Sequence, residues 1–276
     1  MQEGYYVIRT YEAGEVGEKT KFFVPGKPPD GQLSRRQKNA IRKQAQNAYS
    51  SQKNLARIIN ANFTKEDVLI GLDYSDAGLQ KITAWAESKS LIREGMEESE
   101  VMNAIWEAAA HELDNALRRV KRILKKEGKE LKAVYCTSDM DGETGKTVRV
   151  HHHLVVNGDA KEAFQKAWAE YGLGSVEYDN LWPNQIDRTR LAEYLMNQLR
   201  RIPDAKKYRC TRNVVHPVAK DRVVYTDNEL LVPKGGKLIF RQEVTNSLGA
   251  KDYRNKQPQY IRYITPKALA ARSKGE

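Results

Sequence analysis

The sequence has little of what stabilises small secreted proteins or anchors membrane proteins. It contains only two cysteines, Cys136 and Cys210, in no paired spacing, which argues against a disulfide framework and a cysteine zinc site. No apolar run approaches the roughly 18 residues that a membrane-spanning helix needs. The first residues also lack the basic and apolar regions of a secretory signal. We therefore expect a cytoplasmic protein with reduced thiols and no association with membranes.

Acidic residues are also fewer than basic ones. The 276 residues include 47 lysine and arginine residues against 36 aspartate and glutamate residues, so the formal net charge is +11. Such an excess, spread along a chain without membrane segments, indicates an anionic partner, and nucleic acid is the first candidate. Simple solubility is the alternative explanation of the charge.

The order of the expected elements indicates one central α+β domain between two outer segments. Between residues 65 and 202 the pattern is strand, helix, strand, strand, helix, strand, helix, typical of a mostly antiparallel sheet backed by helices. We expect this central domain to span residues 64–217. Residues 1–63 are expected to form an N-terminal hairpin and a basic helical arm, and residues 218–276 a basic, β-rich tail.

Histidine is scarce, with five in the chain, yet three are consecutive in "TVRVHHHLVVNG", residues 147–158. Because side chains alternate along a strand, His151 and His153 lie on one face with Arg149, about 7 Å apart. His152 lies on the other, apolar face. Neutral imidazole is a common metal ligand, and two such ligands leave coordination positions for substrate oxygens. The pattern predicts a metal site on the first face, with an inert surface cluster as the alternative.

A second candidate is a tyrosine on the predicted helix of residues 188–202. At about 100° per residue this helix has an apolar arc and a polar arc. The apolar arc consists of Leu191, Leu195, Leu199 and Ile202. The polar arc consists of Arg190, Asn197, Gln198 and Arg201. Tyr194 lies at the border, so its ring can be held while its hydroxyl faces a basic groove. An ordinary interfacial tyrosine is the alternative.

Together these motifs resemble the HUH endonucleases. "VHHHLVV" is similar to their His-hydrophobe-His pattern, "LAEYLMNQ" looks like their tyrosine helix, and "VLIGLDYS" looks like their first sheet strand. The likeness is to the rolling-circle replication initiators of the filamentous-phage gene II type, and it extends to "IINANFTKEDVLIGLDYS" and "KKYRCTRNVVHP". It covers roughly residues 56–217. It implies that the central domain is an HUH endonuclease domain with an RRM-like sheet.

The resemblance implies a function as well. The protein would nick and join single-stranded DNA site-specifically: Tyr194 would attack a phosphodiester, leaving a 5′-phosphotyrosyl link and a free 3′-hydroxyl that primes replication. His151 and His153 would bind Mg²⁺ or Mn²⁺. A phenol is a weak nucleophile while protonated, so it needs a cation that polarises the phosphate. The implied partners are a single-stranded DNA origin and the host replication machinery.

The sequence departs from the family pattern at two places. Family members often carry a lysine one turn after the tyrosine, where this chain has Asn197 and Gln198; Arg190 or Arg201 could take that role. A third metal ligand, usually glutamate, often ends the strand before the histidines. Asp139 is the nearest carboxylate here, Asp141 is a second candidate, and Gln198 is a further possibility if the helix approaches the metal. No second tyrosine stands at the usual spacing, so we expect a single-tyrosine enzyme.

Basic and polar side chains around the tyrosine are candidate DNA contacts. They are Arg190, Asn197, Gln198, Arg201, Lys206, Lys207 and Arg209. His111, in the middle of a helix, and Trp168 are interpreted as structural residues. Three alternatives stay open: a non-enzymatic binder of single-stranded nucleic acid, a metal hydrolase that uses water, and an HUH relaxase or single-tyrosine transposase.

Overall fold

The chain divides into two compact units in the computed structural model. The residues described by this structure are 4–26, 48–141, 144–181, 185–198, 207–243 and 258–273. The first unit consists of Met1–Asn62, Ile186–Thr189 and Val215–Glu276, and the second of Phe63–Gln185 and Arg190–Val214. The boundaries expected near residues 63 and 217 lie close to the observed ones. The two outer segments, expected as separate parts, belong to one unit.

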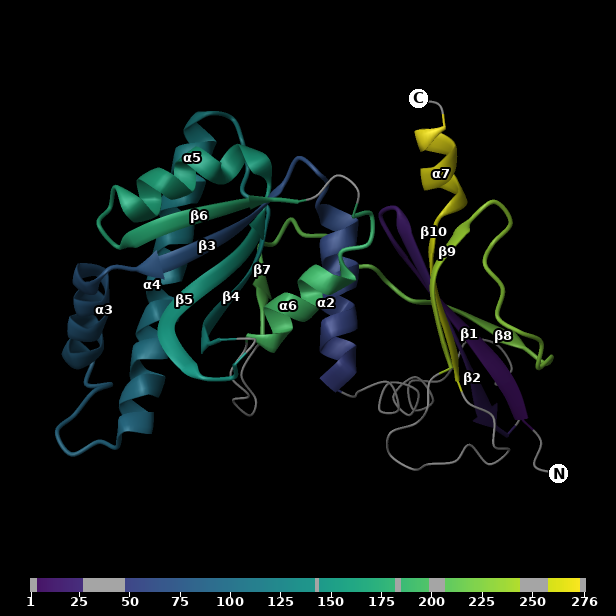
Figure 1. The fold of residues 1–276 in the computed structure, drawn as a ribbon, viewed down its shortest axis with the longest axis horizontal. Coiled ribbons are helices and arrows are strands. Elements are labelled where there is room, and N and C mark those ends of the chain that lie inside the picture. Colours follow the sequence, from purple (N-terminus) through teal and green to yellow (C-terminus); the bar gives the residue numbers. More distant parts are fainter. Residues whose placement is uncertain are drawn as a thin grey trace. The chain divides into compact units, whose positions relative to one another are not determined.

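The second unit has an antiparallel five-stranded sheet with helices packed on one face, so the expected α+β class is confirmed (Figure 1). Its strands in spatial order are β6 (Gly174–Asn180), β3 (Val68–Tyr74), β5 (Thr147–Val156), β4 (Ala133–Met140) and β7 (Arg209–Cys210). The helical segments on this face are α3 (Asp76–Ser88), α4 (Glu98–Lys126), η1 (Gly158–Ala160), α5 (Lys161–Phe164) and η2 (Gln165–Ala169), whereas α6 (Thr189–Asn197) lies against the other face. The histidine strand β5 is central and paired on both sides.

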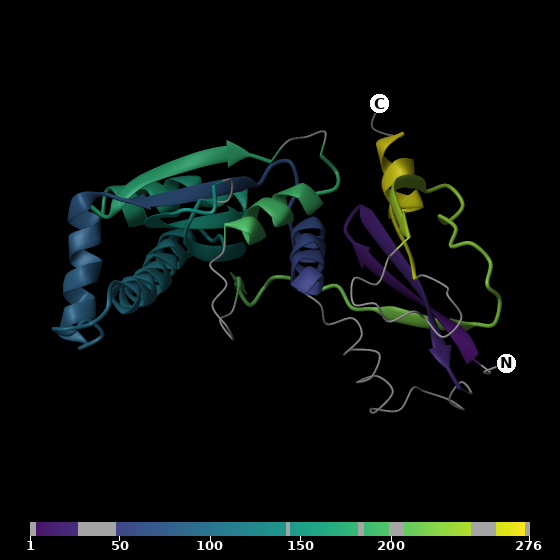
Figure 2. The same ribbon diagram turned by 60° about the horizontal axis from the view of Figure 1, so that its bottom comes forward.

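The core of this unit lies between the sheet and α4 (Figure 2). Alternate residues of β3 point into it, and the apolar stripe of α4 faces them. The buried residues of these two elements include Val68, Ile70, Leu72 and Tyr74, and Leu113, Leu117, Val120 and Leu124. Each fully buried aliphatic side chain contributes about 1.5–3 kcal/mol. The sheet face that carries His152 is therefore fixed toward the helices.

Helix α4 is delimited by its own sequence signals. Glu97 and Glu100 form a reciprocal capping box at its start. At its end Gly128 adopts a φ of 71°, and the amides of Gly128 and Lys129 bond back to the carbonyls of Lys125 and Leu124. These signals delimit the first helix of the strand and helix order predicted for residues 65–202.

The sequence did not place helix α3, which begins after Ser75. The Ser75 hydroxyl accepts a hydrogen bond from the Gly78 amide at 3.1 Å, a normal N-cap. A Cβ at Gly78 would lie 1.8 Å from the carbonyl oxygen of Leu173, so only glycine allows this close approach. The helix is thus fastened to the segment that leads into β6.

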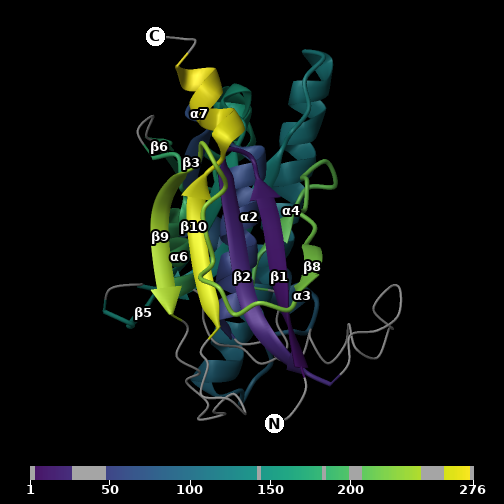
Figure 3. The same cartoon turned by 90° about the vertical axis from the view of Figure 1, so that its right-hand side faces the viewer.

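The first unit is built around a second antiparallel five-stranded sheet, whose strands Figure 3 shows side by side in a face-on view. Its strands in spatial order are β8 (Lys220–Val224), β1 (Gly4–Ala13), β2 (Val16–Pro25), β10 (Gln259–Ile264) and β9 (Lys237–Glu243). Its helices are α2 (Ala48–Asn62) and α7 (Pro266–Arg272). The expected N-terminal hairpin is confirmed as β1 and β2. Residues 27–47 of the basic arm lie outside the described part of the chain. No helix among the described residues is long and apolar enough to cross a membrane.

Candidate functional site

The middle histidine of the triplet is a core residue. His152 is 0% exposed, and its Nδ1 and Nε2 lie 3.0 and 3.1 Å from the hydroxyls of Thr137 and Tyr74. Its ring also contacts Trp168, which is buried as expected. Burial, followed by the two neighbouring imidazoles, lowers the pKa of His152 to about 3. This residue is therefore a neutral structural histidine.

The outer histidines share the opposite face, with ring centroids 4.8 Å apart. Nδ1 of His151 lies 2.9 Å from the carbonyl oxygen of Arg149. Because a carbonyl only accepts, Nδ1 carries a proton, and in the neutral form of the ring Nε2 then keeps its lone pair. Nε2 of His153 is buried and has no hydrogen-bond partner among the described residues. Burial, then His151, lowers the pKa of His153 to about 4, so this imidazole is neutral near pH 7.

Helix α6 brings a phenol and an amide to the same two imidazoles. The ring of Tyr194, which is 46% exposed, has its centroid 5.5 Å from that of His153. Oε1 of the buried Gln198 lies 3.5 Å from Nε2 of His151. If His151 carries a proton on Nε2, this nitrogen donates a hydrogen bond to Oε1. If the only proton is on Nδ1, both atoms are acceptors, and their facing lone pairs suit a shared cation.

A buried serine fastens the end of α6 to the sheet. Ser138, which pairs with His151 across β4 and β5, donates a hydrogen bond from its hydroxyl to the main-chain oxygen of Gln198. The same hydroxyl accepts from the Met140 amide at 3.1 Å, across the irregularity between Ser138 and Met140. The strand beside the histidines thus holds the residue whose amide faces them.

Asp139, the carboxylate expected as third ligand, lies within this irregularity. It is buried and has interactions of its own. Within the described ranges, no three His, Cys, Asp or Glu side chains are grouped so that they could hold a metal ion. The structure thus does not gather Asp139, His151 and His153 into one such group. Gln198 is not one of these four residue types, but its amide oxygen lies 3.5 Å from Nε2 of His151.

The expected DNA-contacting residues are divided between the two faces of the sheet. Arg190, Asn197 and Lys207 are exposed. Arg209 pairs with Tyr135 on β4, and its guanidinium donates to Asp114 of α4 at 3.0 Å. It therefore lies on the helix-covered face, away from the two histidines. Arg201 and Lys206 lie outside the described residues.

Strand β3 supplies two residues beside the site that the sequence analysis missed. Asp73 pairs with His151 and Gly71 with His153, so both lie on the histidine face. A Cβ at Gly71 would meet only the Cβ of Glu177, at 3.7 Å, so open space remains next to His153. The sequence signal that could have identified this position was Asp73 itself, a carboxylate that interrupts the apolar run before "YS". Its use depended on knowing that β3 pairs with β5.

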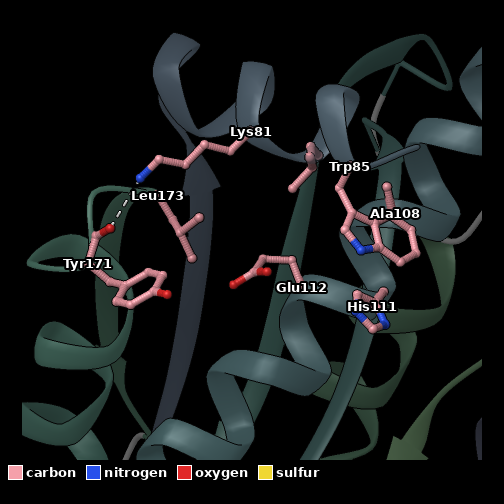
Figure 4. Close-up of a pocket in the computed structure, with 8 residues that line it drawn as sticks. Lys81, Trp85, Ala108, His111, Glu112, Tyr171 and Leu173 are labelled. Carbon is pink, nitrogen blue, oxygen red and sulfur yellow. Dashed lines mark hydrogen bonds between the residues drawn. The ribbon is translucent and has the colours of Figure 1, made fainter. Parts of the chain in front are cut away.

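A cavity of about 300 Å³ lies on the helix side of this unit (Figure 4). Trp85 and His111 stack there with centroids 4.3 Å apart, so the structural interpretation of His111 is compatible with its place. Lys81 donates to the carbonyl of Tyr171 at 3.4 Å, and Glu112 is ion-paired with an arginine of its own helix. Both charged side chains of the lining therefore have protein partners.

We compared the chain with protein-family models, curated proteins and solved structures, and none of the three comparisons found a match. The likeness to the HUH endonucleases therefore stays an interpretation of the sequence motifs. The two imidazoles, the phenol and the amide are the observed features that bear on function.

Proposed function

We propose that this protein nicks and rejoins single-stranded DNA through Tyr194, as a single-tyrosine HUH-type endonuclease that initiates rolling-circle replication. One observation carries the proposal. Two imidazoles, a phenol ring 5.5 Å from one of them, and an amide oxygen 3.5 Å from the other meet on one face of the sheet. A nucleophile, metal ligands and room for a phosphate are what this chemistry needs.

The residues present fit a divalent metal ion such as Mg²⁺ or Mn²⁺. His153 offers a buried ring nitrogen without a partner, and His151 offers Nε2 because its Nδ1 proton is held by the Arg149 carbonyl. Gln198 is our third ligand, since its oxygen faces His151; Asp139 is the second candidate. Such an ion, when bound, would polarise the scissile phosphate and offset its negative charge.

In the proposed reaction, the Tyr194 oxygen bonds to phosphorus and the bond from phosphorus to the 3′ oxygen breaks. The phenolic proton leaves to solvent, to which the half-exposed side chain has access, and the departing 3′ oxygen takes up a proton. His153 packs against the phenol ring and limits its orientation. The exposed Arg190 and Asn197 are available for the flanking phosphates. Rejoining is the reverse reaction.

The test is the formation of a covalent protein–DNA adduct. Incubation with single-stranded origin DNA and Mn²⁺ should give an adduct that resists SDS, and a chelator should prevent it. Tyr194→Phe and His153→Ala should each lose the adduct. Tyr171→Phe, which alters another exposed tyrosine of the same unit, should keep it. An adduct of normal yield in Tyr194→Phe would refute the assignment of the nucleophile.

The other outcomes identify the alternative functions. Metal-dependent cleavage without any adduct would indicate a hydrolase that uses water. DNA binding that is indifferent to chelator and to His153→Ala, without cleavage, would indicate a non-enzymatic binder. A relaxase or transposase would form the same link. An initiator differs from these because the released 3′-hydroxyl is extended by the replication machinery on the element's own origin.

A further inference from the structure

The net positive charge of this protein belongs to one of its two units. The first unit contains 24 lysine and arginine residues and 12 aspartate and glutamate residues, a net charge of +12. The second unit contains 23 lysine and arginine residues and 24 aspartate and glutamate residues, a net charge of −1. The net charges of the two units add to the +11 of the chain. The unit with the candidate site therefore contributes little to long-range attraction of DNA. That attraction has to come from the first unit.

The first unit also exposes apolar side chains along one edge of its sheet. Strand β9 is outermost in the described sheet, and its consecutive residues Leu238, Ile239 and Phe240 are all exposed, Phe240 at 39%. The register of β9 against β10 shifts at Ile239, which is a β-bulge. Such bulges interrupt regular pairing at an edge. The edge is therefore suited to contacts by side chains and not to the addition of another strand.

Three exposed lysines surround the start of this edge. Lys234, Lys237 and Lys267 have no carboxylate partner in the part of the chain that the structure describes. They are brought together because Lys237 pairs with Ile264 at the end of β10. In addition, a Cβ at Gly235, next to Lys234, would lie 3.6 Å from Cβ of Pro266. Unpaired cations at the border of an apolar surface are the components of a single-strand binding site.

The bulge places Lys237 and Phe240 on the same side of the sheet. Phe240 pairs with Arg262 and Lys237 with Ile264, whose side chains alternate onto one face of β10. The guanidinium of Arg262 lies 5.3 Å from the centroid of the Phe240 ring. The ion pair of Arg262 with Asp187, at 2.6 Å, holds that guanidinium in place. The centroid of the Phe240 ring also lies 6.3 Å from that of the Tyr260 ring, and the residue is 39% exposed, so part of its surface is accessible to a ligand.

We propose that this β9 edge binds single-stranded DNA, with a base stacked on Phe240 and phosphates at Lys234, Lys237 and Lys267. The proposal rests on the proposed function only for the choice of DNA as the nucleic acid. A second copy of the chain is a poor occupant because both copies carry the same strong positive charge. Duplex DNA would leave the exposed apolar residues uncovered, since its bases are already stacked.

The test measures equilibrium binding of a fluorescent single-stranded oligonucleotide to the full chain. Tyr194→Phe is the background and a chelator is present, so neither metal nor cleavage contributes. Lys234→Gln, Lys237→Gln and Lys267→Gln together should raise Kd by at least about tenfold. They should also lower the slope of log K against log salt by about 2, at roughly 0.7 per phosphate contact. Phe240→Ala should raise Kd about tenfold, and Phe240→Trp should restore it.

Matched controls come from the second unit. Lys121→Gln, Arg122→Gln and Lys125→Gln remove three exposed charges of α4 and should leave both Kd and slope nearly unchanged. Tyr171→Ala removes an exposed ring that also carries a guanidinium, at 3.8 Å, and should be neutral. Phe240→Leu keeps an apolar side chain, so it separates stacking from folding and should bind as weakly as Phe240→Ala.

Equal effects in the two units, normal binding in Phe240→Leu, or a preference for duplex DNA would overturn the proposal. Failure of the nicking assay would not affect this result, because the binding is measured without metal. Conversely, if the β9 edge did not bind DNA, nicking would still be detected at high protein concentration. The two proposals therefore fail separately.

Discussion

Three identical side chains in a row have unlike chemistry because a strand turns them in opposite directions. His152 is enclosed and hydrogen-bonded at both nitrogens. His151 and His153 face outward, and each leaves Nε2 without a protein donor. The structural histidine positions the other two, since its network with Tyr74 and Thr137 ties β5 to both neighbouring strands. We therefore expect its loss to affect stability first.

The pKa of His152 predicts how stability depends on pH. Above pH 6.5 this imidazole is neutral in both the folded and the unfolded state. As the pH falls from 6.5 toward about 3, His152 is protonated in the unfolded chain but stays neutral in the folded protein. The free energy of unfolding therefore decreases over this range. At pH 5 the loss from this group is about 2 kcal/mol.

Urea unfolding at pH 7.5 and pH 5 checks this expectation. His152→Gln, whose amide can still meet the hydroxyls of Tyr74 and Thr137, should lose about 2 kcal/mol less than the wild type over that interval. His153 stays in both proteins, so the difference isolates His152. The same pH dependence in the two proteins would contradict the neutral buried state.

At the scale of elements, the site depends on how the end of α6 is fastened. Ser138→Ala removes the hydroxyl that donates to the Gln198 carbonyl. We expect about 1–2 kcal/mol lower stability, severalfold weaker Mn²⁺ binding and slower adduct formation, because Gln198 and Tyr194 lose their fixed position. Isothermal titration with Mn²⁺ and urea unfolding measure the two effects.

Ser75→Ala is the matched control for this prediction. It removes the N-cap of α3, at a similar cost of about 1 kcal/mol, without touching α6. Its metal affinity should equal that of the wild type. If Ser75→Ala weakened Mn²⁺ binding as much as Ser138→Ala, the effect would reflect general loosening and not the position of α6.

The elements show which parts of the fold a sequence can predict. Period-two alternation in β5 and amphipathic periodicity in α4 and α6 were sufficient to predict these segments and the faces of the histidines. Helix α3 was missed because its apolar residues are few and its start depends on a serine cap. The position of Asp73 opposite His151 could not be predicted, since strand pairing is a long-range property that local patterns do not encode.

At the scale of the whole molecule, the first and last strands of the chain belong to one sheet. Strand β10 pairs with β2, and β8 pairs with β1, so the sequence-based separation of residues 1–63 from residues 218–276 does not describe the physical unit. The charge pattern became informative only after this pairing was known. Averaged along the chain it indicated a basic protein; sorted by unit it indicates one basic and one nearly neutral part.

This division of charge predicts different responses of binding and chemistry to salt. Raising the salt concentration from about 0.05 to 0.2 M should raise KM for single-stranded DNA steeply, because counterion release at the first unit is lost. The value of kcat at saturating DNA should change by less than about twofold, since the proposed reaction takes place in the second unit on DNA that is already bound. Initial rates of adduct formation give both constants. A parallel fall of kcat would contradict the division.

The central claim is that Tyr194 is the nucleophile facing the two imidazoles. The most direct measurement is mass spectrometry of peptides from the trapped protein–DNA adduct, because the chain offers 14 tyrosines among which to choose. We expect a nucleotide-bearing phosphate on the peptide that contains Tyr194 and on no other. A nucleotide attached to a different tyrosine, or an adduct through another residue type, would contradict it.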